Sequence, residues 1–247
     1  MSNTVNFNDN SEVSLKELFK DLPLESDVLV PLPSEGRFYG TKSASVTVSP
    51  IKFEDEKHLV TSFKNNINPI NMLLTKCVKG VDVQDLLLID KMFLLLKIRE
   101  ISYGETYPAK VTCPKCYKES HVEIDLSKLL INYIPKEVSD PREVKLPKVN
   151  KLAKVRFPRV ADEVFLGTQE EIFNNIWRFV IELNGSSDAV FIAKAIPKLP
   201  IMDVKKLMKE IMRDDLGLNP KFILNCGGCG KNSELEVPIN ENFFSVR

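Results

Sequence analysis

The chain has 247 residues, and its 34 Lys and Arg balance its 34 Asp and Glu, so the formal net charge is zero. Domains that hold nucleic acid by bulk electrostatics are usually markedly basic, and this balance argues against that class. A hydrophobic share of 43% and a charged share of 28% are typical of an ordinary folded protein and argue against wholesale disorder.

No segment predicts a signal peptide or a membrane span, so we expect a cytoplasmic protein without a membrane partner. The most apolar stretch, Leu86 to Leu96, is interrupted by Asp90 and Lys91, whereas a bilayer needs about 20 apolar residues. Thiols stay reduced in the cytoplasm, so the five cysteines are not expected to form stable disulfides. The only two histidines, His58 and His121, leave little material for the commonest acid/base catalysis.

The first half of the chain predicts a mixture of strands and helices. Residues 1–12, rich in Asn, Ser and acid, predict a disordered tail. We expect a short helix over Ser14–Leu22, extended chain with turns over Val28–Gly40, a strand over Ala44–Val48, and helices over Phe53–Lys64, Pro69–Lys79 and Asp82–Ser102. The last helix is apolar on more than one face, so we expect it to be central and nearly surrounded.

The second half alternates strands with helices. We expect strands over Tyr107–Cys113, Ser120–Leu126, Ala153–Val160, Phe222–Asn225 and Ser233–Ile239, a loop over Leu216–Pro220, and helices over Gln169–Leu183, Ser187–Ile196 and Met202–Arg213. Thr168 and Glu171 fit a capping box at the start of the first of these helices. Residues 134–150 carry three prolines among charges and predict a connecting segment.

These elements predict an α+β fold that is mainly helical. We expect an N-terminal α+β region over residues 13–133, the connecting segment over residues 134–150, and a C-terminal helical region over residues 151–247. Each of the two regions contains one Cys-x-x-Cys pair, and these pairs carry the chemistry of the sequence.

The two pairs are Cys113-Pro-Lys-Cys116 and Cys226-Gly-Gly-Cys229. Each pair follows a short apolar strand and precedes an alternating strand, so the two units look like knuckles of one zinc ribbon. Each turn supplies two thiolates, and two facing turns complete a tetrahedral Zn²⁺ site with four sulfur ligands. Four protein ligands leave no open position, so we expect the zinc to be structural and not catalytic.

The spacing of the pairs departs from that of a compact ribbon. The second pair begins 113 positions after the first, whereas compact ribbons have about 15 to 20 residues between their pairs. We therefore expect a split ribbon, with most of the second half of the chain inserted between its knuckles. Such a split closes the inserted region on itself like a clasp.

Three other interpretations of these cysteines remain open, namely a thioredoxin-like redox pair, structural disulfides and unrelated core cysteines. A redox pair sits at a helix start in a βαβ unit, but strands flank both pairs here. Disulfides disagree with a reducing compartment. Cys77 lies among leucines in a predicted helix and is expected to be a buried thiol. We expect His121 to be an exposed strand residue and His58 to be solvated.

Nothing in the sequence argues for an active site or a small-molecule substrate. No Gly-rich phosphate loop, Gly-x-Ser-x-Gly or His-Glu-x-x-His motif occurs, so we do not expect an enzyme. A zinc-ribbon nucleic-acid-associated module is a competing hypothesis, and it would need a basic, aromatic surface on the knuckle strands. Tyr117 and its neighbouring lysines offer a little of this, but Glu119, Glu123 and Asp125 cancel it, so nucleic acid is not the expected partner.

The first half of the chain carries an ordered series of short motifs. In order they are Leu32-Pro-Ser-Glu-Gly-Arg-Phe-Tyr39, Phe53-Glu-Asp-Glu-Lys57, Leu73-Leu-Thr-Lys-Cys-Val78, Val81–Ile89, Leu95–Arg99, Ser102-Tyr-Gly104, and Cys113–Cys116 before Asp125–Leu126. In this succession the chain resembles the baseplate hub assembly proteins of T4-like tailed bacteriophages.

The resemblance implies a role in building the central hub of a contractile-tail baseplate, with the hub proteins as partners. Of the roles known in that family, we expect a non-enzymatic, chaperone-like assembly factor that works in the cytoplasm of the infected bacterial host. The alternative is a permanent structural component of the hub, which would place the protein in the virion.

Overall fold

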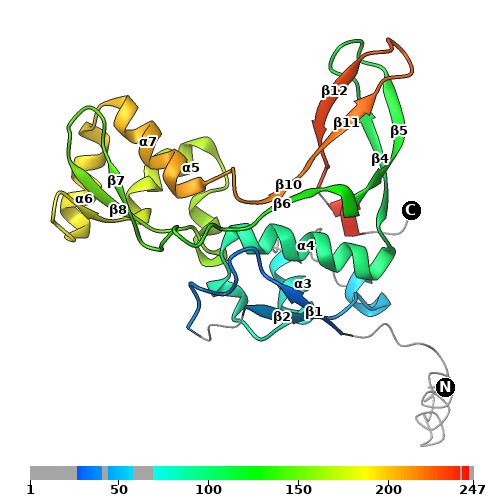
Figure 1. Cartoon of the computed structure of the whole chain (residues 1–247), viewed down its shortest axis with the longest axis horizontal. Coiled ribbons are helices and arrows are strands. Elements are labelled where there is room, and N and C mark those ends of the chain that lie inside the picture. The colour runs from blue at the N-terminus through cyan, green and yellow to red at the C-terminus, as the bar shows by residue number, and fades with distance from the viewer. Residues whose placement is uncertain (1–26, 41–43, 58–68, 240, 245–247) are drawn as a thin grey trace, which may run out of the picture.

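The computed structural model describes residues 27–40, 44–57, 69–239 and 241–244 (Figure 1). The predicted tail, the predicted helix over Ser14–Leu22, His58 and the second half of the predicted helix over Phe53–Lys64 lie outside these residues. Within the described ranges, five complete α-helices, a helical segment over residues 53–57 and twelve β-strands form an α+β fold in which every strand pairing is antiparallel. The α+β class is confirmed, but the expectation of a mainly helical protein is not.

The elements follow one another along the chain as short units. The α-helices are α3 (Pro69–Cys77), α4 (Leu88–Tyr103), α5 (Gln169–Asn175), α6 (Ala189–Ala195) and α7 (Ile201–Met212). The strands are β1 (Val28–Pro31), β2 (Ser45–Val48), β3 (Val78–Lys79), β4 (Thr106–Thr112), β5 (Glu119–Asp125), β6 (Leu130–Asn132), β7 (Arg142–Lys145), β8 (Leu152–Val155), β9 (Val180–Leu183), β10 (Gly217–Asn219), β11 (Lys221–Asn225) and β12 (Asn232–Glu236). The 3₁₀ helices are η1 (Val83–Asp85), η2 (Leu126–Lys128), η3 (Val160–Phe165), η4 (Ile176–Phe179), η5 (Ile196–Lys198) and η6 (Glu241–Phe244).

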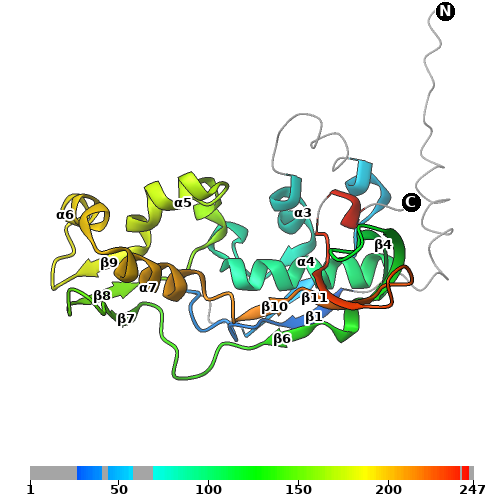
Figure 2. The same ribbon diagram turned by 90° about the horizontal axis from the view of Figure 1, so that it is seen from above.

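The larger of two hydrophobic clusters is built around α4. The sheet β1-β2-β3 and helix α3 lie on one side of α4, and the strand pair β6-β10 lies on another (Figures 1 and 2). Leu94, Leu96 and Ile98 of α4 are almost completely buried. A helix that is apolar all round is stable only when its neighbours cover most of its surface, which this arrangement provides.

The smaller cluster belongs to residues 142–212, which we call the second lobe (left in Figure 1). The three-stranded sheet β7-β8-β9 packs there with α6 and α7. Leu207 and Ile211, four positions apart on one face of α7, are fully buried in this cluster. The carboxylate of Asp203, also buried, accepts hydrogen bonds from the backbone N–H groups of Lys148 and Val149 (2.7 and 3.1 Å).

The chain leaves the first cluster, builds the second lobe and then returns. Residues 216–244 contribute Leu216, Leu224 and Phe243 to the cluster around α4, not to the second lobe. Strand β10 carries the returning chain, since it pairs with β6 and packs on α4 (Figure 2). The second lobe is therefore an insertion between two segments that share one core. The expected region boundaries at residues 133 and 151 remain a prediction.

The predicted helix over Gln169–Leu183 is wrong in its second half. Helix α5 ends at Asn175, η4 follows, and residues 180–183 form β9, which pairs with β8. The buried side chains of Val180 and Leu183 fit a strand because the sheet supplies partners that a helix at this place would lack. The capping box is confirmed, since Thr168 Oγ1 accepts from the Glu171 N–H (3.2 Å) and Glu171 Oε2 accepts from the Thr168 N–H (2.7 Å).

Smaller differences between the predicted and the observed elements also arise from contacts between segments far apart in the sequence. The predicted connection at 134–150 contains β7, which pairs with β8, and the predicted loop at 216–220 contains β10. The predicted helix over Asp82–Ser102 begins as η1 and is interrupted before α4 starts at Leu88. At that break the N–H of Leu87 donates to the hydroxyl of Tyr39 (2.9 Å), so a contact far away in sequence satisfies the backbone.

Candidate metal centre

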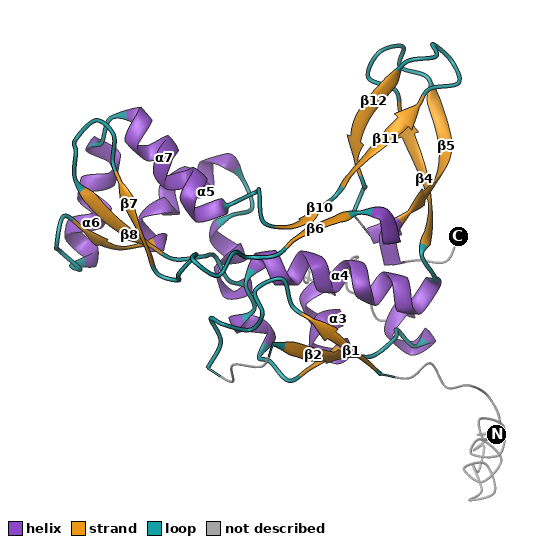
Figure 3. Ribbon diagram, viewed as in Figure 1, coloured by secondary structure: helices purple, strands orange, loops and turns teal. Residues whose placement is uncertain are grey.

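Two β-hairpins, β4-β5 and β11-β12, extend from the part of the protein built around α4, which we call the first lobe, with their turns at the same end (Figure 3). We call them the cysteine hairpins, because each turn carries one Cys-x-x-Cys pair. Along β4 the side chains alternate between exposed and buried, and Tyr107, Ala109 and Val111 face the core. This period of two is what a half-buried strand requires, and it fixes the register that presents the first cysteine pair at the turn.

The two turns have the same backbone hydrogen-bond pattern. In each turn the N–H of the first cysteine donates to the carbonyl five residues on, at 3.0 Å for Cys113 and 3.2 Å for Cys226. The carbonyl of the same cysteine accepts from the residue four positions on, at 2.9 Å from Tyr117 and 2.8 Å from Gly230. Both of these residues have positive φ, 58° for Tyr117 and 68° for Gly230. The knuckles are therefore equivalent in backbone geometry.

The structure brings all four predicted cysteines together. Their Sγ atoms all lie within 4.8 Å of one another, with 3.9 Å between Cys113 and Cys229 and 3.6 Å between Cys116 and Cys226. In a tetrahedron with Zn–S bonds of about 2.3 Å, the sulfur atoms stand about 3.8 Å apart. A disulfide would need about 2.05 Å, and all four thiols are free. The distances fit a four-sulfur metal site and not a disulfide pair.

Backbone amides favour the ionised form of the first cysteine in each knuckle. The N–H groups of Lys115 and Gly228 point at the sulfurs of Cys113 and Cys226 respectively, each at 3.4 Å. Backbone N–H groups, that of Cys229 foremost, lower the pKa of Cys226 to about 6, and those of Lys115 and Cys116 lower the pKa of Cys113. Because the thiolate is the metal-binding form, the first cysteine of each knuckle is prepared for a cation. The pKa of Cys116 changes in the opposite direction: the Lys118 N–H lowers it, but the neighbouring sulfur of Cys226 raises it, to about 11.

The two knuckles are in close contact at a glycine. A Cβ atom at Gly228 would lie 2.6 Å from Cδ of Lys118 and 3.5 Å from Sγ of Cys116. The side chain of Lys118, in the first knuckle, therefore lies against Gly228 of the second knuckle, which has no side chain of its own. A larger residue at Gly228 would require the Lys118 side chain to move.

The other candidate ligands lie apart from this cluster. Cys77, at the end of α3, is buried as expected, and burial raises its pKa to about 12. His121 is an exposed residue of β5, as expected, and does not belong to the sulfur cluster.

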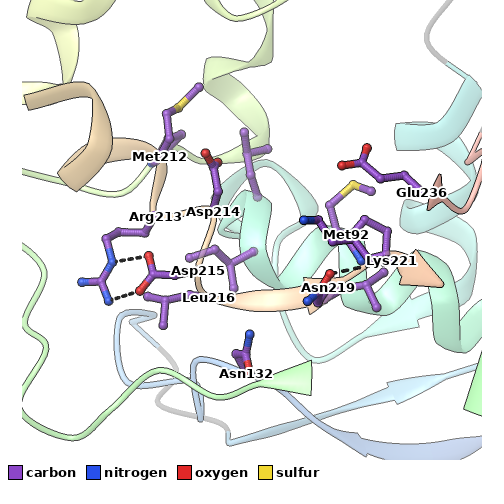
Figure 4. Close-up of a pocket in the computed structure, with 15 residues that line it drawn as sticks. Met92, Asn132, Met212, Arg213, Asp214, Asp215, Leu216, Asn219, Lys221 and Glu236 are labelled. Atoms are coloured by element: carbon purple, nitrogen blue, oxygen red, sulfur yellow. Dashed lines mark hydrogen bonds and ion pairs between the residues drawn. The ribbon is translucent and has the colours of Figure 1, made fainter. Parts of the chain in front are cut away.

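Two features were missed at the level of the sequence. Asp90 and Lys91, which only marked an interruption in an apolar run, are both buried and partnered. Asp90 accepts hydrogen bonds from Ser34 and Tyr39, and Lys91 Nζ contacts Glu163 Oε1 (2.5 Å). The second feature is a cleft beside α4 (Figure 4). The only sequence signal for it was a helix that is apolar on more than one face.

Comparison with known proteins gives one match. A family model described as "T4 bacteriophage base plate protein" matches residues 28–245, which is most of the chain. No curated protein and no solved structure matches the chain. Among the helices that the structure describes, none has the length and hydropathy needed to cross a bilayer.

Proposed function

The chain belongs to the T4 bacteriophage base plate protein family, and from this premise we propose that it is a non-enzymatic, chaperone-like assembly factor for the central hub of a contractile-tail baseplate. The family match over residues 28–245 is the observation that carries the proposal. Membership in this family supports a role in which the protein contacts other baseplate proteins. The motif series from Leu32–Tyr39 to Cys113–Cys116, which resembles hub assembly proteins, supports the hub as the place of that contact.

A permanent structural component of the hub is the second candidate, and the family's description as a base plate protein favours it. Quantitative mass spectrometry of purified phage particles distinguishes the two. An assembly factor is present with hub intermediates from infected cells and absent from the finished particle. Recovery from finished particles in the same molar ratio as hub proteins would overturn the assembly-factor proposal in favour of the structural one.

We also propose that Cys113, Cys116, Cys226 and Cys229 hold one structural Zn²⁺ ion. The tetrahedral spacing of the sulfurs, the amides directed at them and the close approach at Gly228 support this role. With four protein sulfurs as ligands, no position would remain for a substrate, so the ion would hold the two hairpins together. The zinc site would join the segment that precedes the second lobe to the segment that follows it.

We do not propose a nucleic-acid partner, because the five lysines of the cysteine hairpins are balanced by five carboxylates and two of these lysines are in ion pairs. Lys110 Nζ lies 2.7 Å from Glu119, and Lys221 Nζ lies 2.7 Å from Glu234. Phosphate contacts need free cationic groups and give affinity that falls steeply with salt. A DNA titration at two salt concentrations tests this, and tight, salt-sensitive binding would contradict our proposal.

A further inference from the structure

A cleft with a volume of about 670 Å³ lies where the two lobes and the second cysteine hairpin meet (Figure 4). Its walls come from the start of α4, the end of α7, β10, and the base of β11 and β12. An occupant of this cleft would thus touch both the second lobe and the body around α4. Its volume is within the usual range for ligand-binding clefts in proteins.

The floor of the cleft is a part of α4 that its neighbours leave partly open. Leu88 and Ile89 are half-buried, and Met92 is 37% exposed. Met212, from the end of α7, lines the cleft as well. Because apolar side chains line this face of α4, leaving it uncovered costs free energy unless another apolar surface covers it. Methionine side chains are flexible and adapt to different partner shapes.

The rim of the cleft carries a net negative charge. Arg213 is paired with Asp215 through two contacts of 2.8 Å, and Lys221 is bonded to Glu234. Asp214 and Glu236, which also line the cleft, have no ion-pair partner within 4.0 Å among the residues that the structure describes. Two carboxylates without a direct ion pair therefore stand beside an apolar floor, and Lys221 compensates Glu236 only at longer range.

We propose that this cleft docks a segment of another baseplate protein in which apolar side chains stand between basic ones. The apolar side chains would cover Met92 and its neighbours, and lysine or arginine would pair with Asp214 and Glu236. An acidic segment would be repelled by the same carboxylates. This inference rests on the proposed function, since it names the chemistry of the partner that the function requires.

Binding of synthetic peptides to the full-length protein tests the docking chemistry. The probes are three fluorescein-labelled peptides of equal length, made of alternating Lys and Leu, Glu and Leu, or Lys and Ser, and the readout is fluorescence anisotropy. The Lys–Leu peptide is expected to bind at least about tenfold more tightly than either of the others. The Lys–Leu peptide is expected to lose about tenfold in affinity for Met92→Glu and for the double variant Asp214→Lys with Glu236→Lys.

Met202→Glu is the matched control, because it places the same new charge at the other end of α7 on a side chain that is 51% exposed. It should bind the Lys–Leu peptide as the wild-type protein does. The charge-reversal variant alters only exposed carboxylates, so it remains informative if Met92→Glu folds poorly. Equal affinity for the acidic peptide, unchanged binding by both cleft variants, or no binding of any peptide would overturn the proposal.

Co-purification from infected cells separates this inference from the proposed function. If the wild-type protein recovers no baseplate proteins, the proposed function fails. If the wild-type protein and both cleft variants recover the same baseplate proteins in equal amounts, the function stands and the cleft proposal is overturned. The expected result is recovery by the wild-type protein and by Met202→Glu, and loss with both cleft variants.

Discussion

The Sγ atoms of Cys113 and Cys229 lie 3.9 Å apart, although 116 positions separate these residues in the chain. The whole second lobe lies between them in sequence. Bringing such distant segments together costs loop-closure entropy. A strong cross-link between them offsets this cost. Structural zinc in finger peptides binds with about 10 to 16 kcal/mol, whereas whole domains are stable by only about 5 to 15 kcal/mol. One ion at this place would therefore decide whether the hairpins stay together.

The first prediction concerns metal content. The purified protein is expected to carry one equivalent of zinc, and both Cys113→Ser and Cys226→Ser should lower this content strongly. The double variant should cost little more stability than either single variant, because loss of one ligand already empties the site. Elemental analysis measures the zinc, and thermal unfolding measures the stability.

Cys77→Ser is the control for these variants, because Cys77 is buried in α3 and does not belong to the sulfur cluster. It should leave the zinc content unchanged even if it lowers stability. Full zinc occupancy in either single variant would contradict the four-sulfur site. So would a wild-type protein without metal after purification in the absence of chelators.

The second prediction concerns the approach of β10 to α4. Gly217 has φ +77°, and a Cβ there would lie 2.7 Å from Cγ2 of Ile89 and 3.2 Å from its carbonyl oxygen. Gly217→Ala is expected to lower the free energy of unfolding by about 2 to 5 kcal/mol, from overpacking added to backbone strain. Gly80→Ala, at φ +102° with nothing within 4 Å, should show the strain alone. Equal losses in urea unfolding would show that β10 does not pack this closely on α4.

The third prediction tests the equivalence of the two knuckles. Tyr117 occupies the left-handed position that Gly230 occupies in the second knuckle, and its side chain is 79% exposed. Gly230→Ala should destabilise by about 1 to 2 kcal/mol. Tyr117→Gly should be nearly neutral, because relief of strain offsets the extra freedom of the unfolded chain. Urea unfolding of both variants measures this, and a loss above about 1 kcal/mol for Tyr117→Gly would reveal a stabilising contact of the ring.

The fourth prediction is a pH dependence at the entry to η3. Burial alone would raise the pKa of Asp162, but hydrogen bonds from the Arg156 guanidinium (2.6 and 2.8 Å) and the Arg159 N–H lower it below 3.8. A carboxyl with a lowered folded-state pKa contributes stability above the unfolded-state value, and this contribution is lost as the pH falls through the folded-state value.

Asp162→Asn should therefore cost about 1.5 to 3 kcal/mol at pH 7 and progressively less below pH 3.8, where the wild-type carboxyl also becomes neutral. Unfolding by urea across this range measures the difference. The control is Asp214→Asn, whose exposed carboxylate has no ion-pair partner among the described residues. A penalty for Asp162→Asn that does not change with pH would show that the ion pair with Arg156 contributes nothing.

Much of the local structure follows from the sequence alone. The Cys-x-x-Cys turns and their flanking strands were predictable, since strand alternation and turn chemistry act over a few residues. The same holds for the capping box at Thr168 and the ending of α4 at Gly104, where φ is 87°. The apolar residues of α4, which cover more than one face, also predicted its central position.

Tertiary structure alone decided the rest, because pairing between distant segments overrides local preference. Residues 180–183 continue a helical pattern in sequence, yet they form β9 since β8 offers an edge to pair with. Strand β10 exists only because β6 lies opposite it. The sequence supplied four thiols, but their meeting within 4.8 Å depends on how the chain returns from the second lobe to the core around α4. No local pattern encodes that return, because it depends on the burial of apolar surfaces that come from segments far apart in the sequence.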